Sequence, residues 1–294
     1  MRVIHSSVLL ALAATPALFA QSPKAMTPED LFRRNIGTKE QMDKQFPPFK
    51  IAGNLYYVGT ESLASFLIVT PEGDILINSD YERNVPTIKD SVEKLGFHFS
   101  DIKILLGSHA HADHMEGDAM VKELTGAKLM AMQDDIPALL KITPGGKPQV
   151  VDRVLHDGDE VSLGGTTLVA HLTPGHTRGC TSWSTKIQDG AKSYNVVIIG
   201  SIGVNPGYQL VDNKDVPHIA DEYMHSFAVL RSLPCDIPLG SHPGMFNLAE
   251  KYAKLGKSTT NPFIDPEGYQ KEIEVNETAF NNRRAEQMKA AEAK

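Results

Sequence analysis

Four metal-binding side chains lie within six consecutive positions, and this cluster constrains the possible folds of the chain more than any other feature of its sequence. The segment has the sequence His109-Ala110-His111-Ala112-Asp113-His114. Histidine and aspartate both bind borderline metals such as zinc at neutral pH. The segment therefore indicates a metal centre, and a metal-dependent hydrolase is the first class of protein to consider.

The residues on either side of the cluster predict a buried strand that leads through a loop into a helix. Residues 102–106 are almost all aliphatic, which favours a strand, and residues 116–124 favour a helix. A rigid strand would fix the loop in place and leave it open to a substrate. Because His109 and His111 are two residues apart, they point the same way in an extended chain. Asp113 and His114 follow where the chain turns, so one segment could serve two neighbouring metal ions.

Strand and helix patterns are interspersed along the rest of the chain, with hairpin-like steps such as Pro71-Glu72-Gly73. This order predicts a layered α/β protein with mixed sheets. Residues 141–149 are rich in proline and glycine, which predicts a mobile loop and a candidate cover for a substrate. Strands are expected within 51–59, 63–70, 74–78, 128–132, 150–171, 181–186 and 196–199, and helices within 84–95, 136–140, 216–232, 248–255 and 267–294.

The first twenty residues predict a secretory signal peptide. Arg2 precedes an apolar stretch that ends in small residues, and cleavage is expected after Ala20, with Ala17 as the alternative. The stretch is too short to span a bilayer comfortably, and no cysteine lies near the cut to carry a lipid anchor. We therefore expect an exported protein without a membrane anchor.

The composition of the chain limits the number of domains and the kinds of partner that we expect. The 294 residues contain no Pro/Ser-rich linker or charge block, so we expect a single domain over residues 21–294. A net charge of −7 without a basic stripe argues against a nucleic-acid partner. Cys180 and Cys235 are the two cysteines, and the sequence leaves open whether they pair.

Two later histidines, His176 and His242, stand in turns rich in glycine and proline. A lone histidine in such a turn is usually a surface residue. In a chain that already carries the 109–114 cluster, two such residues become candidate ligands. The two turns are Thr173-Pro174-Gly175-His176-Thr177 and Leu239-Gly240-Ser241-His242-Pro243-Gly244.

Together these motifs resemble those of the metallo-β-lactamase superfamily, and specifically class B β-lactamases of the third subclass. The resemblance covers roughly residues 45–270 and implies an αββα sandwich, in which two mixed sheets are flanked by helices. It also implies two Zn²⁺ per chain, the first held by His109, His111 and His176 and the second by Asp113, His114 and His242. Further similar segments are Arg178-Gly179-Cys180, Gly200-Ser201-Ile202-Gly203-Val204-Asn205-Pro206-Gly207-Tyr208, Met245-Phe246 and Asn261-Pro262-Phe263-Ile264-Asp265-Pro266.

The resemblance implies a zinc-dependent β-lactamase that hydrolyses the lactam amide of penicillins, cephalosporins and carbapenems through a zinc-bound hydroxide. Asp113 would orient the nucleophile, and Tyr208 would donate a hydrogen bond to the developing oxyanion. Ser201, Asn205 and Tyr208 would bind the substrate. With the export signal, this implies an antibiotic-resistance enzyme in the periplasm with a small-molecule substrate. We expect a monomer, although the sequence does not reveal the oligomeric state.

Two other interpretations stay open. Lactonases and thiolesterases of the same fold resemble one another in carrying a bridging aspartate after a strand that ends in glycine, whereas this chain has Ser201 after Gly200. A non-catalytic zinc-binding protein is the second alternative, but structural zinc sites are closed and usually rich in cysteine.

Two weaker motifs are rejected. Lys251 stands where a phosphate loop ending at Gly256 would need its first glycine. Leu239 likewise replaces the first glycine of a nucleophile elbow around Ser241.

Overall fold

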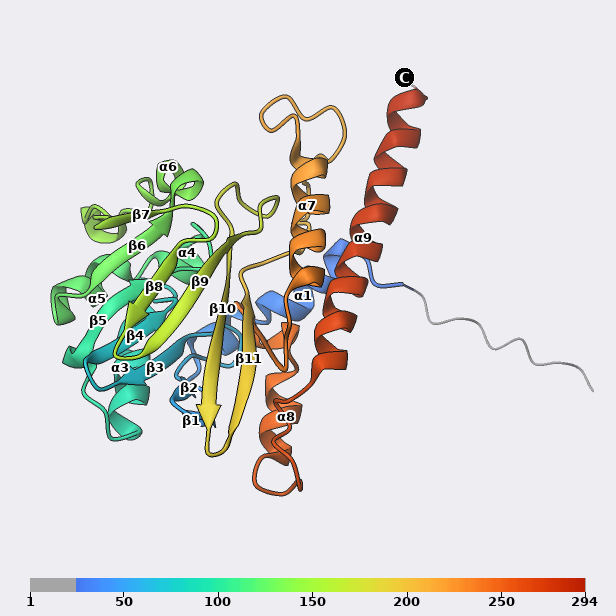
Figure 1. The fold of residues 1–294 in the computed structure, drawn as a ribbon. Helices are drawn as coiled ribbons and strands as arrows, with labels where there is room; N and C mark the ends of the chain where they lie inside the picture. Colours follow the sequence, from blue (N-terminus) through green and yellow to red (C-terminus); the bar gives the residue numbers. More distant parts are fainter. Residues whose placement is uncertain (1–24, 294) are drawn as a thin grey trace, which may run out of the picture.

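The computed structural model describes residues 25–293, in which two β-sheets pack face to face with helices on both outer faces (Figure 1). This layering confirms the expected αββα sandwich. The predicted signal peptide at residues 1–20 lies outside the described residues. The covering helices are α3 (Val85–Lys94) and α5 (Asp118–Thr125) on the first sheet, and α7 (Ile219–Ser232) and α9 (Pro266–Glu292) on the second.

The first sheet has the strand order β1 to β7 and is mixed. Strands β1 to β4 pair antiparallel, and β4 to β7 pair parallel. Parallel strands need long crossover connections, which here contain α3 and α5. The strands are β1 (Phe49–Ala52), β2 (Leu55–Tyr57), β3 (Phe66–Thr70), β4 (Gly73–Ile77), β5 (Ile102–Leu106), β6 (Lys128–Met132) and β7 (Arg153–Leu155).

The second sheet has the order β12-β11-β10-β9-β8. Strands β8 to β11 pair antiparallel, whereas β12 pairs parallel with β11. The long β10–β11 hairpin forms the centre of this sheet (Figure 1). The strands are β8 (Glu160–Leu163), β9 (Thr166–Leu172), β10 (Thr181–Asp189), β11 (Lys192–Ile199) and β12 (Ile237–Gly240).

Shorter helices occupy the connections. The remaining α-helices are α1 (Pro28–Ile36), α2 (Lys39–Asp43), α4 (Ala112–Met115), α6 (Ile136–Leu139) and α8 (Leu248–Lys254). Single 3₁₀ turns lie at Glu82–Asn84, Phe99–Asp101, Gln133–Asp135, Pro144–Gly146 and Pro243–Met245.

Strand side chains build apolar layers on both faces of a sheet, because successive residues of a strand point to opposite faces. Ile75 and Ile77 of β4 belong to the layer between the sheets, together with Trp183 of β10. Leu76 points the other way and packs in the layer with Ile88 of α3. Both faces of the central strands are therefore buried, which explains their nearly continuous apolar sequences.

The structure corrects several expected boundaries. The stretch 51–59 is two strands rather than one, because Gly53 turns the chain with a φ of 50° between β1 and β2. A Cβ at Gly53 would lie 2.2 Å from the Gln188 carbonyl oxygen, so the turn requires glycine. The helix expected at 116–124 is α5, and the separate short helix α4 already contains Asp113 and His114.

Helix α1 was not predicted, although its sequence carries a recognisable start signal. Thr27 is the N-cap, and its hydroxyl accepts a hydrogen bond from the Asp30 N–H at 3.2 Å. The Asp30 carboxylate in turn accepts from the Thr27 N–H at 3.0 Å, which completes a capping box, with Pro28 in the first turn. Helix α2 and strand β12 were also missed.

The carboxyl ends of strands from both sheets meet along one edge of the sandwich. Strands β4, β5 and β6 run parallel, and so do β11 and β12 of the second sheet. Two backbone hydrogen bonds join the sheets here, from the Thr181 N–H to the Ser108 oxygen at 2.8 Å and from the Ala64 N–H to the Ser241 oxygen at 3.0 Å. Loops that leave the two sheets are thereby held against one another.

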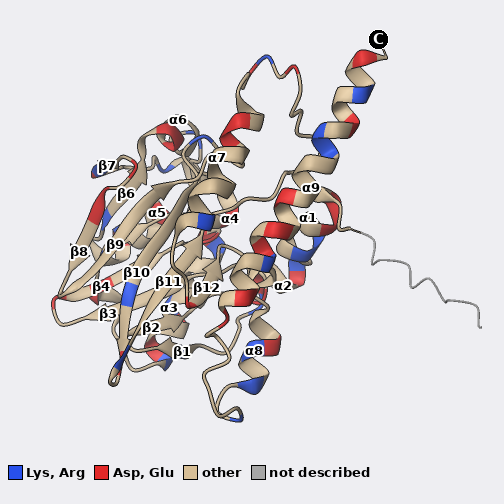
Figure 2. Cartoon of the chain, turned by 45° about the vertical axis from the view of Figure 1, so that its right-hand side comes forward, with Lys and Arg blue, Asp and Glu red and all other residues tan. Residues whose placement is uncertain are grey.

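Charged residues lie mainly on the helices and loops, and α9 carries both acidic and basic residues along its length (Figure 2). The strands are largely uncharged in the same view. This distribution agrees with the absence of a basic stripe in the sequence. Within residues 25–293, no helix is long and apolar enough to cross a bilayer.

Candidate metal centre

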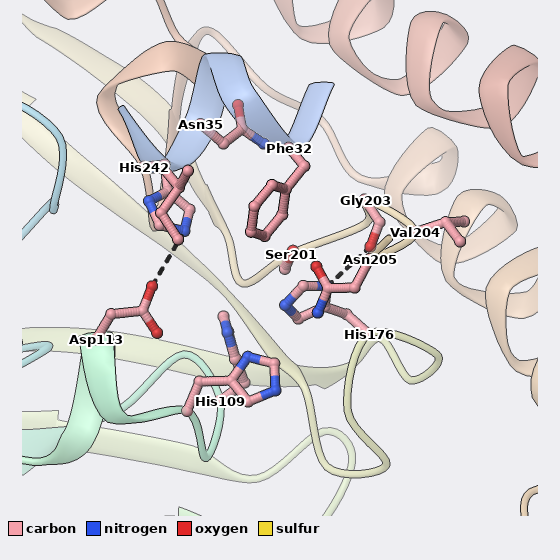
Figure 3. Close-up of a pocket in the computed structure, with 12 residues that line it drawn as sticks. Phe32, Asn35, His109, Asp113, His176, Ser201, Gly203, Val204, Asn205 and His242 are labelled. Atoms are coloured by element: carbon pink, nitrogen blue, oxygen red, sulfur yellow. Dashed lines mark hydrogen bonds and ion pairs between the residues drawn. The ribbon is translucent and has the colours of Figure 1, made fainter. Parts of the chain in front are cut away.

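Six candidate ligands from three segments converge at the edge where the two sheets meet. These segments follow β5, β9 and β12, and the first includes helix α4, which carries Asp113 and His114. Figure 3 shows His109, Asp113, His176 and His242 around a common space. The structure thus brings together all the expected ligands, which are His109, His111, Asp113, His114, His176 and His242.

The first group of ligands consists of three histidines. One ring nitrogen each of His109, His111 and His176 lies within 4.8 Å of the others. The ring centroids of His109 are 4.7 Å from His111 and 4.6 Å from His176. Three imidazoles leave one tetrahedral position open, which is the arrangement of catalytic zinc sites.

The second group consists of Asp113, His114 and His242, whose ligand atoms also lie within 4.8 Å of one another. The Asp113 Oδ2 is 3.4 Å from the His114 Nε2 and 3.7 Å from the His242 Nε2. The ring centroids of His114 and His109 are 4.3 Å apart. The two groups are therefore adjacent, as a two-metal site requires.

Backbone carbonyls fix the orientation of two of the histidines. The His176 Nδ1 lies 2.8 Å from the Gly203 oxygen, and the His242 Nδ1 lies 3.0 Å from the Ser62 oxygen. A carbonyl oxygen can only accept, so each Nδ1 carries the proton and donates it. The Nε2 lone pair is then free to bind a metal, which is the usual arrangement around protein metal ions.

Several ring nitrogens in the site are buried and have no hydrogen-bond partner among residues 25–293. They are the Nε2 of His109 and both ring nitrogens of His114. Buried polar atoms in proteins are nearly always paired. A metal ion supplies a partner for such nitrogens, so these residues fit a metal centre.

The electrostatics of the site also favour metal binding. Burial lowers the pKa of His114 and His176 to about 3, and burial together with neighbouring imidazoles holds the pKa of His109 well below its ordinary value. Burial opposes ionisation of Asp113, but the neighbouring histidines outweigh it and lower the pKa of its carboxyl. Neutral imidazoles and an ionised carboxylate are the forms that bind a cation at pH 7.

The cavity beside these ligands has one wall from the loop that follows β11 and one from α1. Ser201, Gly203, Val204 and Asn205 line the first wall (Figure 3). Two expected substrate-binding residues, Ser201 and Asn205, therefore lie in the cavity. The described lining includes no residue of the 141–149 loop, which was the expected cover.

Helix α1 supplies the wall that the sequence analysis missed. Phe32, Asn35 and Ile36 line the cavity, and Phe32 points into it opposite Ser201 (Figure 3). The helix packs closely on the turn after His242, where a Cβ at Gly244 would lie 2.6 Å from the Arg34 carbonyl oxygen. The capping box of α1 could have revealed the helix, but not its position over the site.

Tyr208 lies behind the His176 loop rather than in the described lining of the metal cavity. Its hydroxyl donates to the His176 carbonyl oxygen at 2.9 Å and accepts from the Asn205 amide at 3.4 Å. To donate to a substrate, the hydroxyl would have to leave its bond to the carbonyl. The expected catalytic role of Tyr208 stays a prediction.

The two cysteines do not pair in the structure. Cys180 is fully buried beside the Ser201 carbonyl oxygen, towards which its thiol donates at 3.4 Å. Cys180 therefore packs as a small core residue next to the site.

A buried carboxyl, that of Asp118 in α5, lies near the His114 segment, because the Ser79 hydroxyl contacts both the His114 carbonyl oxygen and Asp118. Its Oδ1 accepts from the Ser79 hydroxyl at 2.7 Å, and its Oδ2 has no hydrogen-bond partner in the part of the chain that the structure describes. Burial raises the pKa of Asp118 to about 8. The carboxyl is therefore mostly protonated at pH 7 in the folded protein, whereas an unfolded aspartate ionises near pH 4.

This raised pKa predicts a pH-dependent loss of stability. Below about pH 4 both states hold the proton, and between about pH 4 and 8 only the unfolded state releases it, so the free energy of unfolding falls as pH rises. Asn is a neutral isostere, so the free energy of unfolding of Asp118→Asn, relative to that of the wild type, should rise by on the order of 3–4 kcal/mol between pH 5 and 8. Urea unfolding of the metal-free proteins at both pH values tests this. Parallel curves for the two proteins would contradict a neutral Asp118.

Comparisons with known proteins agree with this fold and site. The family model described as the metallo-beta-lactamase superfamily matches residues 58–242, which is more than half of the chain. The chain therefore belongs to the metallo-β-lactamase superfamily.

Solved structures narrow the family to one subclass. The chain is 56% identical to the native FEZ-1 metallo-β-lactamase from Legionella gormanii, with a TM-score of 0.81 over 84% of this chain and 98% of that one. It is 37% identical to BJP-1, a subclass B3 metallo-β-lactamase of Bradyrhizobium japonicum, with a TM-score of 0.79 over 86% and 98% of the two chains. It is also 32% identical to the class B3 di-zinc metallo-β-lactamase LRA-12 from an Alaskan soil metagenome, with a TM-score of 0.76 over 83% and 97%. These neighbours are class B β-lactamases of the third subclass, as the sequence motifs predicted.

Curated relatives are more distant. The hydroxyacylglutathione hydrolase of Maricaulis maris is 27% identical over 140 residues, which is 48% of this chain. The matched region spans 45% of that enzyme, less than half of its length.

Proposed function

We propose that this protein is a zinc-dependent β-lactamase that hydrolyses the lactam amide of penicillins, cephalosporins and carbapenems. The observation that carries the proposal is the convergence of two three-residue ligand groups at one cavity. The 56% identity to FEZ-1 over nearly all of that chain supports the substrate class. The di-zinc neighbour LRA-12 supports two Zn²⁺ per chain.

Each ligand group would hold one ion. His109, His111 and His176 would bind the first, and their donor set leaves room for a non-protein ligand. Asp113, His114 and His242 would bind the second. When bound, zinc lowers the pKa of water toward neutrality and polarises a carbonyl.

The protein's own contribution is to orient ligands and substrate. Asp113 lines the cavity beside the first group, where its carboxylate could orient a nucleophilic water as well as bind the second metal. The Ser201 and Asn205 side chains offer polar contacts to the substrate carboxylate from one wall of the cavity. Phe32 and Ile36 of α1 offer apolar contacts from the other wall. No side-chain nucleophile is required, so we expect no acyl-enzyme.

A metal-dependent lactonase or thiolesterase is the alternative function. The similarity to hydroxyacylglutathione hydrolases over part of the chain favours it. Against it stand the weaker identity of those relatives and the presence of Ser201 after Gly200.

Hydrolysis assays separate the alternatives. Purified zinc-loaded protein should turn over a carbapenem, a chelator should abolish that activity, and added zinc should restore it. The same preparation is assayed on an acyl-homoserine lactone and on a glutathione thiolester. Turnover of the lactone or of the thiolester without turnover of the carbapenem would support the alternative. Two bound zinc ions without turnover of any substrate would support a non-catalytic zinc-binding protein.

We further propose that residues 21–294 form a single domain that acts as a monomer in the periplasm and contributes to antibiotic resistance. The apolar stretch of residues 8–20 after Arg2 supports export.

A further inference from the structure

One buried acidic residue beside the metal centre belongs to neither ligand group. Asp135 follows β6, so it lies at the same edge of the first sheet as the loop after β5. Only 3% of the residue is exposed. It stands at the N-cap position of α6, yet its side chain makes no capping hydrogen bond there. Its carboxylate instead points at two loops from elsewhere in the chain.

Within residues 25–293, all the hydrogen bonds of this carboxylate go to the loops that carry the three histidines. Its Oδ2 accepts from the Ala110 N–H at 2.8 Å and from the Thr177 hydroxyl at 2.8 Å. Its Oδ1 accepts from the Gly179 N–H at 2.7 Å. Ala110 lies between two ligands of the first group, and Thr177 directly follows the third. One side chain thus fastens together the two segments that supply the whole first group.

The approach of the second loop depends on a glycine. A Cβ at Gly179 would lie 2.4 Å from the Asp135 nitrogen and 2.7 Å from its Cβ, distances that real Cβ atoms do not show. The absence of a side chain at Gly179 therefore lets its backbone lie directly against the Asp135 carboxylate. By contrast, no hydrogen bond of Asp135 reaches the segment of Asp113 and His114, or the loop of His242.

We propose that Asp135 is a positioning residue for the first metal site. By holding residues 109–111 and 176–179 in register, its carboxylate sets the spacing of His109, His111 and His176 without binding the metal itself. A fixed spacing raises metal affinity because the ligands need no rearrangement on binding. The inference rests on the proposed metal centre but not on the proposed substrate.

The test measures the two metal sites separately. In a His242→Ala background only the first group is complete, and in a His176→Ala background only the second is. Zinc affinity is measured in each background by competition with a chromophoric chelator. Asp135→Asn keeps the shape of the side chain but presents an amide N–H₂ to a backbone N–H, so it should weaken zinc binding about 10–100-fold in the His242→Ala background. It should leave the affinity unchanged in the His176→Ala background.

Asp134→Asn is the matched control, because Asp134 is the exposed neighbour on the same turn. It should change neither affinity. Equal losses in both backgrounds would indicate a purely structural role and overturn the inference, as would an unchanged affinity in the His242→Ala background. If Asp135→Asn does not fold, Thr177→Val removes one of the three donors and should give a smaller loss confined to the first site. Failure of the His242→Ala parent to bind zinc would overturn the metal centre, and this inference with it.

Discussion

Replacing His176 by alanine should lower kcat/KM for carbapenem hydrolysis on the order of 10³-fold, because an ion at the first site could no longer activate water efficiently. The variant leaves two imidazoles where the site has three, which is too few to hold zinc tightly. It also removes the N–H that the Gly203 carbonyl accepts at 2.8 Å, so the wall that contains Ser201 and Asn205 loses an anchor. Zinc stoichiometry measured on the same preparation should fall from two ions to one.

His171→Ala is the matched control for this loss. His171 lies on β9 five residues before His176, is half-buried, and bonds through its Nε2 to the Ser184 hydroxyl at 2.7 Å. It is outside both ligand groups. The control variant should keep two zinc ions and nearly full activity. A His176→Ala enzyme that retains more than a tenth of the wild-type rate would exclude His176 as a ligand needed for catalysis.

The sequence predicts both the layers of the fold and the six ligands, but for different reasons. Strand β5 and strand β6 have the bounds expected from their apolar runs, because each is buried on both faces. The 109–114 segment alone predicts a metal site, since residues of these types so close together are typical of metal binding. His176 and His242 became convincing only as parts of motifs that resemble a known family.

The parts that sequence did not reveal depend on contacts between distant segments. Asp135 is one of two adjacent aspartates, and only the structure distinguishes it from the exposed Asp134. The position of α1 depends on its bond to α9, where the Arg34 guanidinium makes a bidentate ion pair with the nearly buried Glu272, with N–O distances of 2.8 and 2.5 Å. These residues are 238 positions apart, so no local pattern connects them. Local sequence predicts that a helix forms, but not which cavity it will line.

Replacing Trp183 by alanine should lower the free energy of unfolding by about 3–5 kcal/mol, which is the usual effect of removing a large aromatic core side chain. Trp183 lies on β10 between the two sheets and is 1% exposed. Its indole N–H donates to the buried Gly107 carbonyl oxygen at 3.1 Å, two residues before His109. The same side chain therefore fills the core and secures the start of the metal loop.

Trp183→Phe separates these two contributions. Phenylalanine keeps most of the apolar contact but leaves the Gly107 oxygen without its donor, so the expected loss is about 1–3 kcal/mol. Unfolding of the metal-free proteins in urea is followed by circular dichroism, because Trp183 is the only tryptophan and its removal abolishes that fluorescence signal. The dependence on urea concentration should keep its slope, since the surface exposed on unfolding changes little. A loss below about 1 kcal/mol for the alanine variant would mean that the two sheets move together and fill the space left by the indole ring. The contact between the sheets near the metal loop would then be less rigid than the packing around Trp183 indicates.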